Sequence, residues 1–238
     1  MPRKNKPTIE FEQLAPAKID IKSLSLTDRQ KCLLKISLSE ENKITFISGP
    51  AGSTKTFMAV YSALRKLKRD ENLDLLYVRT IIESADKGLG ALPGDIGEKT
   101  NPYMGPLDDK LRELIPSGSG VVSDLIKKKR VQAMPINFLR GANWINKIVI
   151  ADEAQNFTFK ELTTLMTRIG HGTQLFICGD YMQSDINGKS GFKEMFNLFD
   201  DESSKSKGIE CFSFGLDDIK RSAILSFIIK KITKNLPK

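Results

Sequence analysis

Short apolar runs rich in β-branched residues alternate with segments of helical periodicity along most of the chain. Four runs have the length and composition of buried strands, at residues 44–48, 73–78, 147–151 and 174–178. Segments that predict helices stand between or after them, at residues 56–69, 159–169 and 216–232. This alternation is typical of βαβ units. The pattern therefore predicts an α/β fold with a mostly parallel central sheet flanked by helices.

The last predicted helix carries an apolar stripe. Within residues 216–232, one helical face holds Leu225, Ile228, Ile229 and Ile232. An amphipathic helix usually buries such a face, so we expect these side chains to pack into the core.

Two stretches lack this periodicity. Residues 1–23 begin with prolines among basic residues, which predicts a mobile basic N-terminal arm. Residues 80–120 are rich in proline and glycine, so we expect a functional insertion there rather than a part of the scaffold. The remainder, residues 24–238, has the size of one domain.

The composition has a clear excess of basic residues. Lysine and arginine number 37 against 29 aspartates and glutamates, which gives a formal charge of +8 over 238 residues. Clustered cations gain affinity for polyanions by releasing counterions, so the charge favours RNA or single-stranded DNA as a partner. The three cysteines lack disulfide or zinc spacing, and no apolar run predicts a membrane span or a secretion signal. We expect a cytoplasmic protein without membrane contact.

A glycine-containing loop follows the first predicted strand and leads into the first predicted helix. Its residues are Gly49, Pro50, Ala51, Gly52, Ser53, Thr54, Lys55 and Thr56. A phosphate-binding P-loop requires this context, because backbone N–H groups of the loop and of the helix N-terminus then surround the phosphates. Lys55 is expected to neutralise the β- and γ-phosphate oxygens of ATP. The hydroxyl of Thr56 is expected to ligate Mg²⁺.

One loop position departs from the usual pattern. Thr54 stands where the last glycine of G-x-x-x-x-G-K-[ST] is expected, which brings a Cβ and a hydroxyl into a crowded loop. Because Thr54 directly precedes the helix, we expect near-helical backbone angles there, without a positive φ. The substitution leaves room for weaker nucleotide binding.

Acidic and amide side chains follow the next two strands that reach the same sheet edge. Asp152 and Glu153 come directly after residues 147–151, and ligands of α/β sheets bind at this carboxyl edge. We expect Asp152 to hold Mg²⁺ and Glu153 to polarise the water that attacks the γ-phosphate. After residues 174–178, the amide of Gln183 suits sensing of the γ-phosphate, with a capped turn as the alternative.

Together these motifs resemble the PhoH family of superfamily 1-like P-loop ATPases. The resemblance spans roughly residues 24–232, with further matches in family order at residues 92–95, 101–103, 138–141, 167–170 and 218–222. It implies a RecA-like core, ATP hydrolysis, a hexameric ring, and an association with RNA metabolism and phosphate starvation. The compact length, Thr54 and residues 188–192 look most similar to versions carried by bacteriophages, which implies the host cytoplasm as the location.

Four further residues are candidates for the nucleotide site. Gln30 precedes the first strand by about the distance at which superfamily 1 helicases carry an adenine-reading glutamine, although a solvated helix residue is the alternative. Ring-forming ATPases often complete the site with an arginine from the neighbouring subunit. Arg168 and Arg221 are the expected candidates for this role, with Arg140 as a third and an ordinary ion pair as the alternative.

Two groups of residues are candidates for contact with nucleic acid. Cations and one aromatic ring suited to single-strand binding occur in or next to residues 80–120, namely Arg79, Lys87, Lys99 and Tyr103. The densest basic cluster, residues 127–130, fits either such a contact or a solvated face at a helix end.

The sequence therefore favours an ATPase that acts on RNA or single-stranded DNA. Because the chain has one RecA-like domain, translocation would need neighbouring subunits to complete each site. The competing reading is a nucleotide-gated binding protein with little or no turnover. Glu153 disfavours a small-molecule kinase, and the acidic residues show no convergent cluster of the kind that a nuclease uses.

Overall fold

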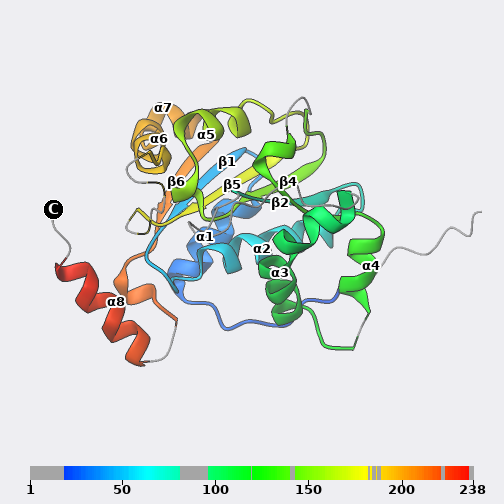
Figure 1. Cartoon of the computed structure of the whole chain (residues 1–238), viewed down its shortest axis with the longest axis horizontal. Coiled ribbons are helices and arrows are strands. Elements are labelled where there is room, and N and C mark those ends of the chain that lie inside the picture. Colours follow the sequence, from blue (N-terminus) through cyan, green and yellow to red (C-terminus); the bar gives the residue numbers. More distant parts are fainter. Residues whose placement is uncertain are drawn as a thin grey trace, which may run out of the picture.

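Six parallel strands form one sheet between two layers of helices (Figure 1). This computed structural model describes residues 19–80, 96–118, 120–139, 143–181, 183, 186, 189–220 and 223–235. The strand order is β3-β2-β4-β5-β1-β6. The predicted fold class, an α/β P-loop fold with a parallel central sheet, is confirmed.

The strands are short and mostly buried. Their bounds are β1 Ile44–Ser48, β2 Asp74–Arg79, β3 Val131–Pro135, β4 Lys147–Ala151, β5 Gln174–Gly179 and β6 Ile209–Ser213. The four central strands coincide with the predicted runs to within a residue at each end. The two edge strands, β3 and β6, were not predicted.

Eight α-helices and three 3-10 turns connect the strands in the described part of the chain. The α-helices are α1 Asp28–Leu38, α2 Lys55–Leu67, α3 Ile96–Leu114, α4 Val121–Lys127, α5 Phe159–Met166, α6 Phe192–Phe199, α7 Glu202–Ser206 and α8 Ala223–Asn235. The 3-10 turns are η1 Ile136–Leu139, η2 Ala154–Asn156 and η3 Leu216–Asp218. Capping boxes fix where α1 and α5 begin, since Thr27 and Thr158 each exchange hydrogen bonds with the third helical residue.

Alternate residues of each strand enter two separate cores. Tyr77 and Ile150 belong to the core shared with α1 to α4, whereas Val78 and Ala151 belong to the core shared with α5 and α6. This division follows from the two-residue period of a strand that is buried on both faces. It also decides which side of the sheet each strand-end residue occupies.

Helix α3 corrects the expectation of an insertion at residues 80–120. The helix continues through Pro102 and Pro106, and its Leu107, Leu111 and Leu114 are fully buried in the core beside α2. Residues 81–95 lie outside the described part of the chain. Residues 96–114 are therefore scaffold, because apolar burial at a helical spacing outweighs the local cost of the two prolines.

Residues 19–23 of the predicted N-terminal arm are packed against the body of the molecule. Ile19 is buried in the core, and the backbone N–H of Lys22 donates to the carbonyl of Leu114 at 2.8 Å. Residues 19–23 thus pack on α3 rather than forming part of a mobile arm. Residues 1–18 lie outside the description.

The C-terminal helix α8 differs most from its prediction. The segment 216–232 is not one helix, because it contains η3 and then begins a new helix at Ala223. Figure 1 shows α8 projecting from the body of the molecule. The apolar side chains described on α8 are largely exposed, including Phe227 at 59% and Ile232 at 57%, while the side chain of Leu225 lies outside the description. The expectation that Ile228 and Ile232 are core residues is therefore wrong.

Candidate nucleotide-binding site

The loop between β1 and α2 has the geometry of a phosphate cradle. Gly49 and Gly52 have φ angles of 155° and 76°, which L side chains rarely adopt. A Cβ on Gly49 would lie 2.8 Å from both Phe214 Cβ and Ser53 Oγ, so the loop passes too close to its neighbours for any other residue there. Ser53 fixes the turn by donating from Oγ to the Pro50 carbonyl at 2.8 Å.

Lys55 reaches back across this loop. Its Nζ donates to the carbonyl oxygens of Gly49 and Pro50 at 2.7 and 2.9 Å. Burial lowers the pKa of the ammonium from its usual 10.5, and Asp180 is the largest of the nearby negative groups that oppose this shift. A buried cation whose charge is incompletely compensated is well suited to bind phosphate oxygens.

Thr54 has a left-handed backbone, so the expectation of near-helical angles is wrong. Its φ and ψ are 67° and 17°, because α2 begins only at Lys55 and the loop must still turn at Thr54. For a residue with a Cβ this conformation costs about 1–2 kcal/mol. Gln30 Nε2 offsets part of the cost by donating to Thr54 Oγ1 at 3.0 Å.

Gln30 is fixed at both ends of its amide. Besides its bond to Thr54, its Oε1 accepts from the backbone N–H of Thr27 at 3.0 Å in the capping box of α1. The side chain is buried and lines the cavity above the loop. The alternative of a solvated helix residue is wrong.

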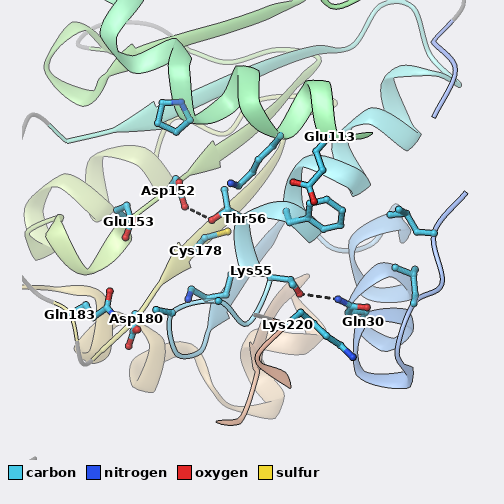
Figure 2. A pocket seen from close by; sticks show the side chains of 18 of the residues that line it. Gln30, Lys55, Thr56, Glu113, Asp152, Glu153, Cys178, Asp180, Gln183 and Lys220 are labelled. Carbon is cyan, nitrogen blue, oxygen red and sulfur yellow. Dashed lines mark hydrogen bonds between the residues drawn. The ribbon is translucent and has the colours of Figure 1, made fainter. Parts of the chain in front are cut away.

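Asp152 lies opposite Thr56 across the sheet edge. Thr56 Oγ1 donates to Asp152 Oδ1 at 2.5 Å, and Figure 2 shows the two side chains directed toward each other. The other carboxylate oxygen, Oδ2, accepts a hydrogen bond from the hydroxyl of Tyr77 on β2. Burial and the negative charge of Asp152 raise the pKa of Tyr77, so its hydroxyl stays protonated and remains a donor.

Glu153 directly follows Asp152 and has a left-handed backbone, with φ 55°. Gln155 Nε2 donates to its Oε2 at 2.7 Å, and Arg79 Nη2 lies 3.6 Å from its Oε1. The other end of the Gln155 amide, Oε1, accepts from the backbone N–H of Asp180 at 3.0 Å. Gln155 therefore links the ends of β4 and β5.

Asp180 and Gln183 occupy the same edge. Strand β5 lies between β1 and β4, so the residues that follow it fall between the P-loop and the Asp152–Glu153 pair. Both side chains line the cavity, Asp180 buried and Gln183 exposed (Figure 2). The backbone N–H of Gln183 donates to the Asp180 carbonyl at 3.2 Å, so the turn given above as the alternative is present. The Gln183 side chain lines the cavity as well.

These groups surround one cavity of about 660 Å³. Figure 2 shows Gln30 and Lys220 at one end and Glu153, Asp180 and Gln183 at the other. Sequence reasoning missed three charged residues of its wall, which are Lys110, Glu113 and Lys220. The burial of α3 and the hydrogen bond from Lys220 N to Gly52 O at 3.0 Å bring them there. The helical spacing of Leu107, Leu111 and Leu114 was the available signal for α3, whereas the Lys220 contact leaves no local pattern in the sequence.

The residues present fit ATP and Mg²⁺. The loop has the open, glycine-dependent turn that phosphates need, and a buried ammonium lies across it. The Thr56 hydroxyl and the Asp152 carboxylate supply oxygen ligands of the type that Mg²⁺ prefers. Among the residues that the structure describes, no group of three or more His, Cys, Asp or Glu side chains suits a further metal ion.

Of the expected arginines, the structure describes only Arg168. Arg168 follows α5 and is absent from the cavity wall, while Arg140 and Arg221 lie outside the described residues. Lys87 and the side chain of Lys99 are likewise outside the description.

The other residues predicted to contact nucleic acid lie in three different surroundings. Arg79 lines the cavity, but Tyr103 packs partly buried against the core. In the basic cluster, Arg130 Nη2 donates to three carbonyls around the end of α2, those of Leu67, Asp70 and Leu73 at 3.4, 3.1 and 2.7 Å. Arg130 is therefore structural.

Comparison with known proteins gives a consistent family match. The family model described as "PhoH-like protein" matches residues 22–233. A PhoH-like protein of Bacillus subtilis is 32% identical over 204 residues, which is 84% of this chain and 61% of that protein. A PhoH-like protein of Synechocystis is 36% identical over 160 residues, 67% of this chain and 47% of that protein. Protein PhoH of Escherichia coli K12 is 30% identical over 189 residues, 78% of this chain and 51% of that protein. The chain spans about half the length of these relatives.

Solved structures resemble the chain more distantly. The match with the Pif1 helicase from Candida albicans covers 81% of this chain and 40% of the helicase chain, at 16% identity and a TM-score of 0.38. The Hsp104–ADP complex of S. cerevisiae covers 86% of this chain and 34% of its own, at 15% identity and a TM-score of 0.33. No helix in the described part of the chain is both long and apolar enough to span a membrane.

Proposed function

Because this chain belongs to the PhoH family, we propose that it binds ATP with Mg²⁺ and hydrolyses it in a cycle that acts on RNA or single-stranded DNA. One observation carries the proposal. Lys55, the Thr56–Asp152 pair and Glu153 converge on one cavity at the carboxyl edge of the sheet. This set of groups is the one that a P-loop ATPase uses.

The residues have separate roles in the proposed reaction. The loop N–H groups and Lys55 bind the phosphates, while Thr56 and Asp152 hold Mg²⁺. When bound, Mg²⁺ neutralises charge that develops on the β- and γ-phosphate oxygens. The water oxygen bonds to the γ-phosphorus as the bond to the bridging oxygen breaks, and that electron pair stays on ADP. Glu153 takes the proton from the water, and Gln183 contacts the γ-phosphate side.

Gln30 is proposed to border the adenine. It lies at the end of the cavity opposite Glu153, and each end of its amide keeps one further hydrogen-bonding position beyond its bonds to Thr27 and Thr54. Since Gln30 also holds Thr54, a base bound there is coupled to the loop that binds the phosphates.

Nucleic acid and self-assembly belong to the same proposal. The charge of +8 supports a polyanionic partner. The exposed apolar side chains of α8 support contact between copies of the chain, and a ring would place Arg168 or Arg221 of one subunit near the ATP of the next. A hexamer, a role in phosphate starvation and a bacteriophage origin stay predictions from the family resemblance.

A second function has one observation in its favour. Glu153 is held by both Gln155 and Arg79, so its carboxylate is engaged in the structure. A protein that binds ATP to control assembly, with little turnover, is compatible with this arrangement and with the strained Thr54.

Release of free phosphate from ATP, with and without single-stranded RNA, tests the proposal. Turnover without any added acceptor, increased by RNA, supports an ATPase rather than a kinase. Tight ATP binding with negligible release under both conditions would instead favour the nucleotide-gated binding protein.

A further inference from the structure

Strand β2 supplies one partner to each of the two acids that follow β4. Tyr77 and Arg79 are two residues apart on β2, which pairs with β4 in parallel, so they project on the same side of the sheet. Tyr77 donates a hydrogen bond to Asp152, and Arg79 forms an ion pair with Glu153. The magnesium ligand and the proposed base are thus both positioned by the strand next to their own.

The two contacts differ in strength. Tyr77 is fully buried and its hydroxyl is hydrogen-bonded to Asp152. The Arg79–Glu153 pair has a separation of 3.6 Å and side chains that are 26% and 44% exposed. Ion pairs of this length and exposure are weak and are easily displaced by a competing anion. Arg79 is therefore the exchangeable contact of the two.

Glu153 keeps an anchor if Arg79 leaves. Gln155 is buried, donates to Glu153 Oε2 and accepts from Asp180 N, so it stays fixed between β4 and β5. Loss of the Arg79 contact would free only Oε1 of the carboxylate. An oxygen released in this way is available to accept a proton from water, while the other oxygen holds the orientation.

Arg79 has the chemistry to exchange a carboxylate for a phosphate. Its planar guanidinium binds a phosphate through two parallel N–H groups, which a carboxylate at 3.6 Å does not use. It ends β2 at the rim of the cavity, whose wall also holds Lys110 of α3. Two cations from different elements thus line the cavity.

We propose that Arg79 couples nucleic-acid binding to hydrolysis: a backbone phosphate of a bound single strand takes Arg79 from Glu153 and frees Oε1 to act as the base. The inference rests on the proposed ATPase function and names its regulation. Without the strand, Arg79 restrains Glu153 and turnover is slow. With the strand, the same arginine becomes part of the nucleic-acid contact.

The test compares Arg79→Ala and Arg79→Lys with wild type and with Arg112→Ala, which removes an exposed arginine paired with Asp108 outside the cavity wall. Phosphate release, affinity for ATP and affinity for an oligo(U) RNA are measured for each. An oligo(dT) strand of the same length distinguishes DNA from RNA as the source of the phosphate.

Arg79→Ala is expected to raise turnover without RNA by about two- to fivefold, the factor that matches a half-exposed ion pair. Addition of RNA should then raise turnover little further. The slope of the logarithm of RNA affinity against the logarithm of salt concentration should fall by the amount expected for the loss of about one phosphate contact. Arg79→Lys should keep part of the RNA stimulation, and Arg112→Ala should behave as wild type.

Three results would overturn the coupling. Undiminished RNA stimulation in Arg79→Ala would show that Arg79 does not couple RNA binding to hydrolysis. The proposed ATPase function would still stand. A loss of ATP affinity or of basal turnover in that variant would show that Arg79 binds the γ-phosphate instead. If wild type releases no phosphate under any condition, the proposed function fails, and the coupling fails with it.

Discussion

Gln30 Nε2 donates to Thr54 Oγ1 at 3.0 Å, so a residue of the first helix holds the loop position that departs from the glycine pattern. The threonine hydroxyl supplies a bond that glycine lacks, and this bond opposes the strain of a left-handed backbone. The substitution at Thr54 is thus compensated by its surroundings.

Thr54→Gly should change the free energy of unfolding by no more than about 1 kcal/mol, because relief of strain and loss of the hydrogen bond are of similar size. ATP affinity should be retained. Combined with Gln30→Ala in a double-mutant cycle, the coupling free energy from urea unfolding should be about 0.5–1.5 kcal/mol. Strictly additive effects would show that the two side chains do not support each other.

Tyr77→Phe should raise the Mg²⁺ concentration needed for half-maximal turnover and destabilise the fold by about 1–3 kcal/mol, because Asp152 Oδ2 loses a buried donor. Magnesium titration and thermal unfolding measure the two effects. Tyr61→Phe is the control, since that hydroxyl accepts from Arg65 away from the cavity. Equal behaviour of both variants would contradict a positioning role for Tyr77.

Lys55→Met should raise the melting temperature of the nucleotide-free protein and abolish the further rise that ATP causes in wild type. The pKa of Lys55 is lowered in the folded state, so its charge disfavours folding below that pKa. This penalty disappears as pH rises toward the unfolded value of 10.5. The difference in melting temperature between variant and wild type should therefore shrink at alkaline pH, and a difference independent of pH would contradict the assignment.

The exposed face of α8 gives a prediction about assembly. Replacement of Phe227 and Ile232 by glutamate should leave the fold intact and reduce the mass of the ATP-bound protein measured by light scattering, because apolar contact between copies is lost. Leu198→Glu is the control, as this exposed residue lies on α6. A wild type that stays monomeric with ATP, or a variant that assembles normally, would refute assembly through α8.

The central part of this fold and site is predictable because it depends on local patterns. The four buried strands are continuous apolar runs, and the loop and acidic motifs directly follow two of them. The chemistry of these two motifs can therefore be predicted from their spacing alone.

Most of the remainder depends on contacts that no local pattern encodes, or on patterns that prolines obscure. Edge strand β6 is only half-buried, so it lacks a continuous apolar run, and α3 contains two prolines that the burial of Leu107 and Leu111 outweighs. Thr54 has a left-handed backbone whose strain is offset by a contact 24 residues away, with Gln30. Tyr77 reads as an ordinary core residue until the pairing of β2 with β4 brings it to Asp152.

Phosphate release by Glu153→Gln tests the central claim most directly. The amide keeps the size of the side chain but cannot accept the proton, so turnover should fall by about 10²–10⁴-fold with and without single-stranded RNA. ATP affinity should stay close to that of wild type, and Glu194→Gln on the exposed face of α6 should have no effect. Undiminished turnover in Glu153→Gln would contradict the account, because the base would then have to be another residue.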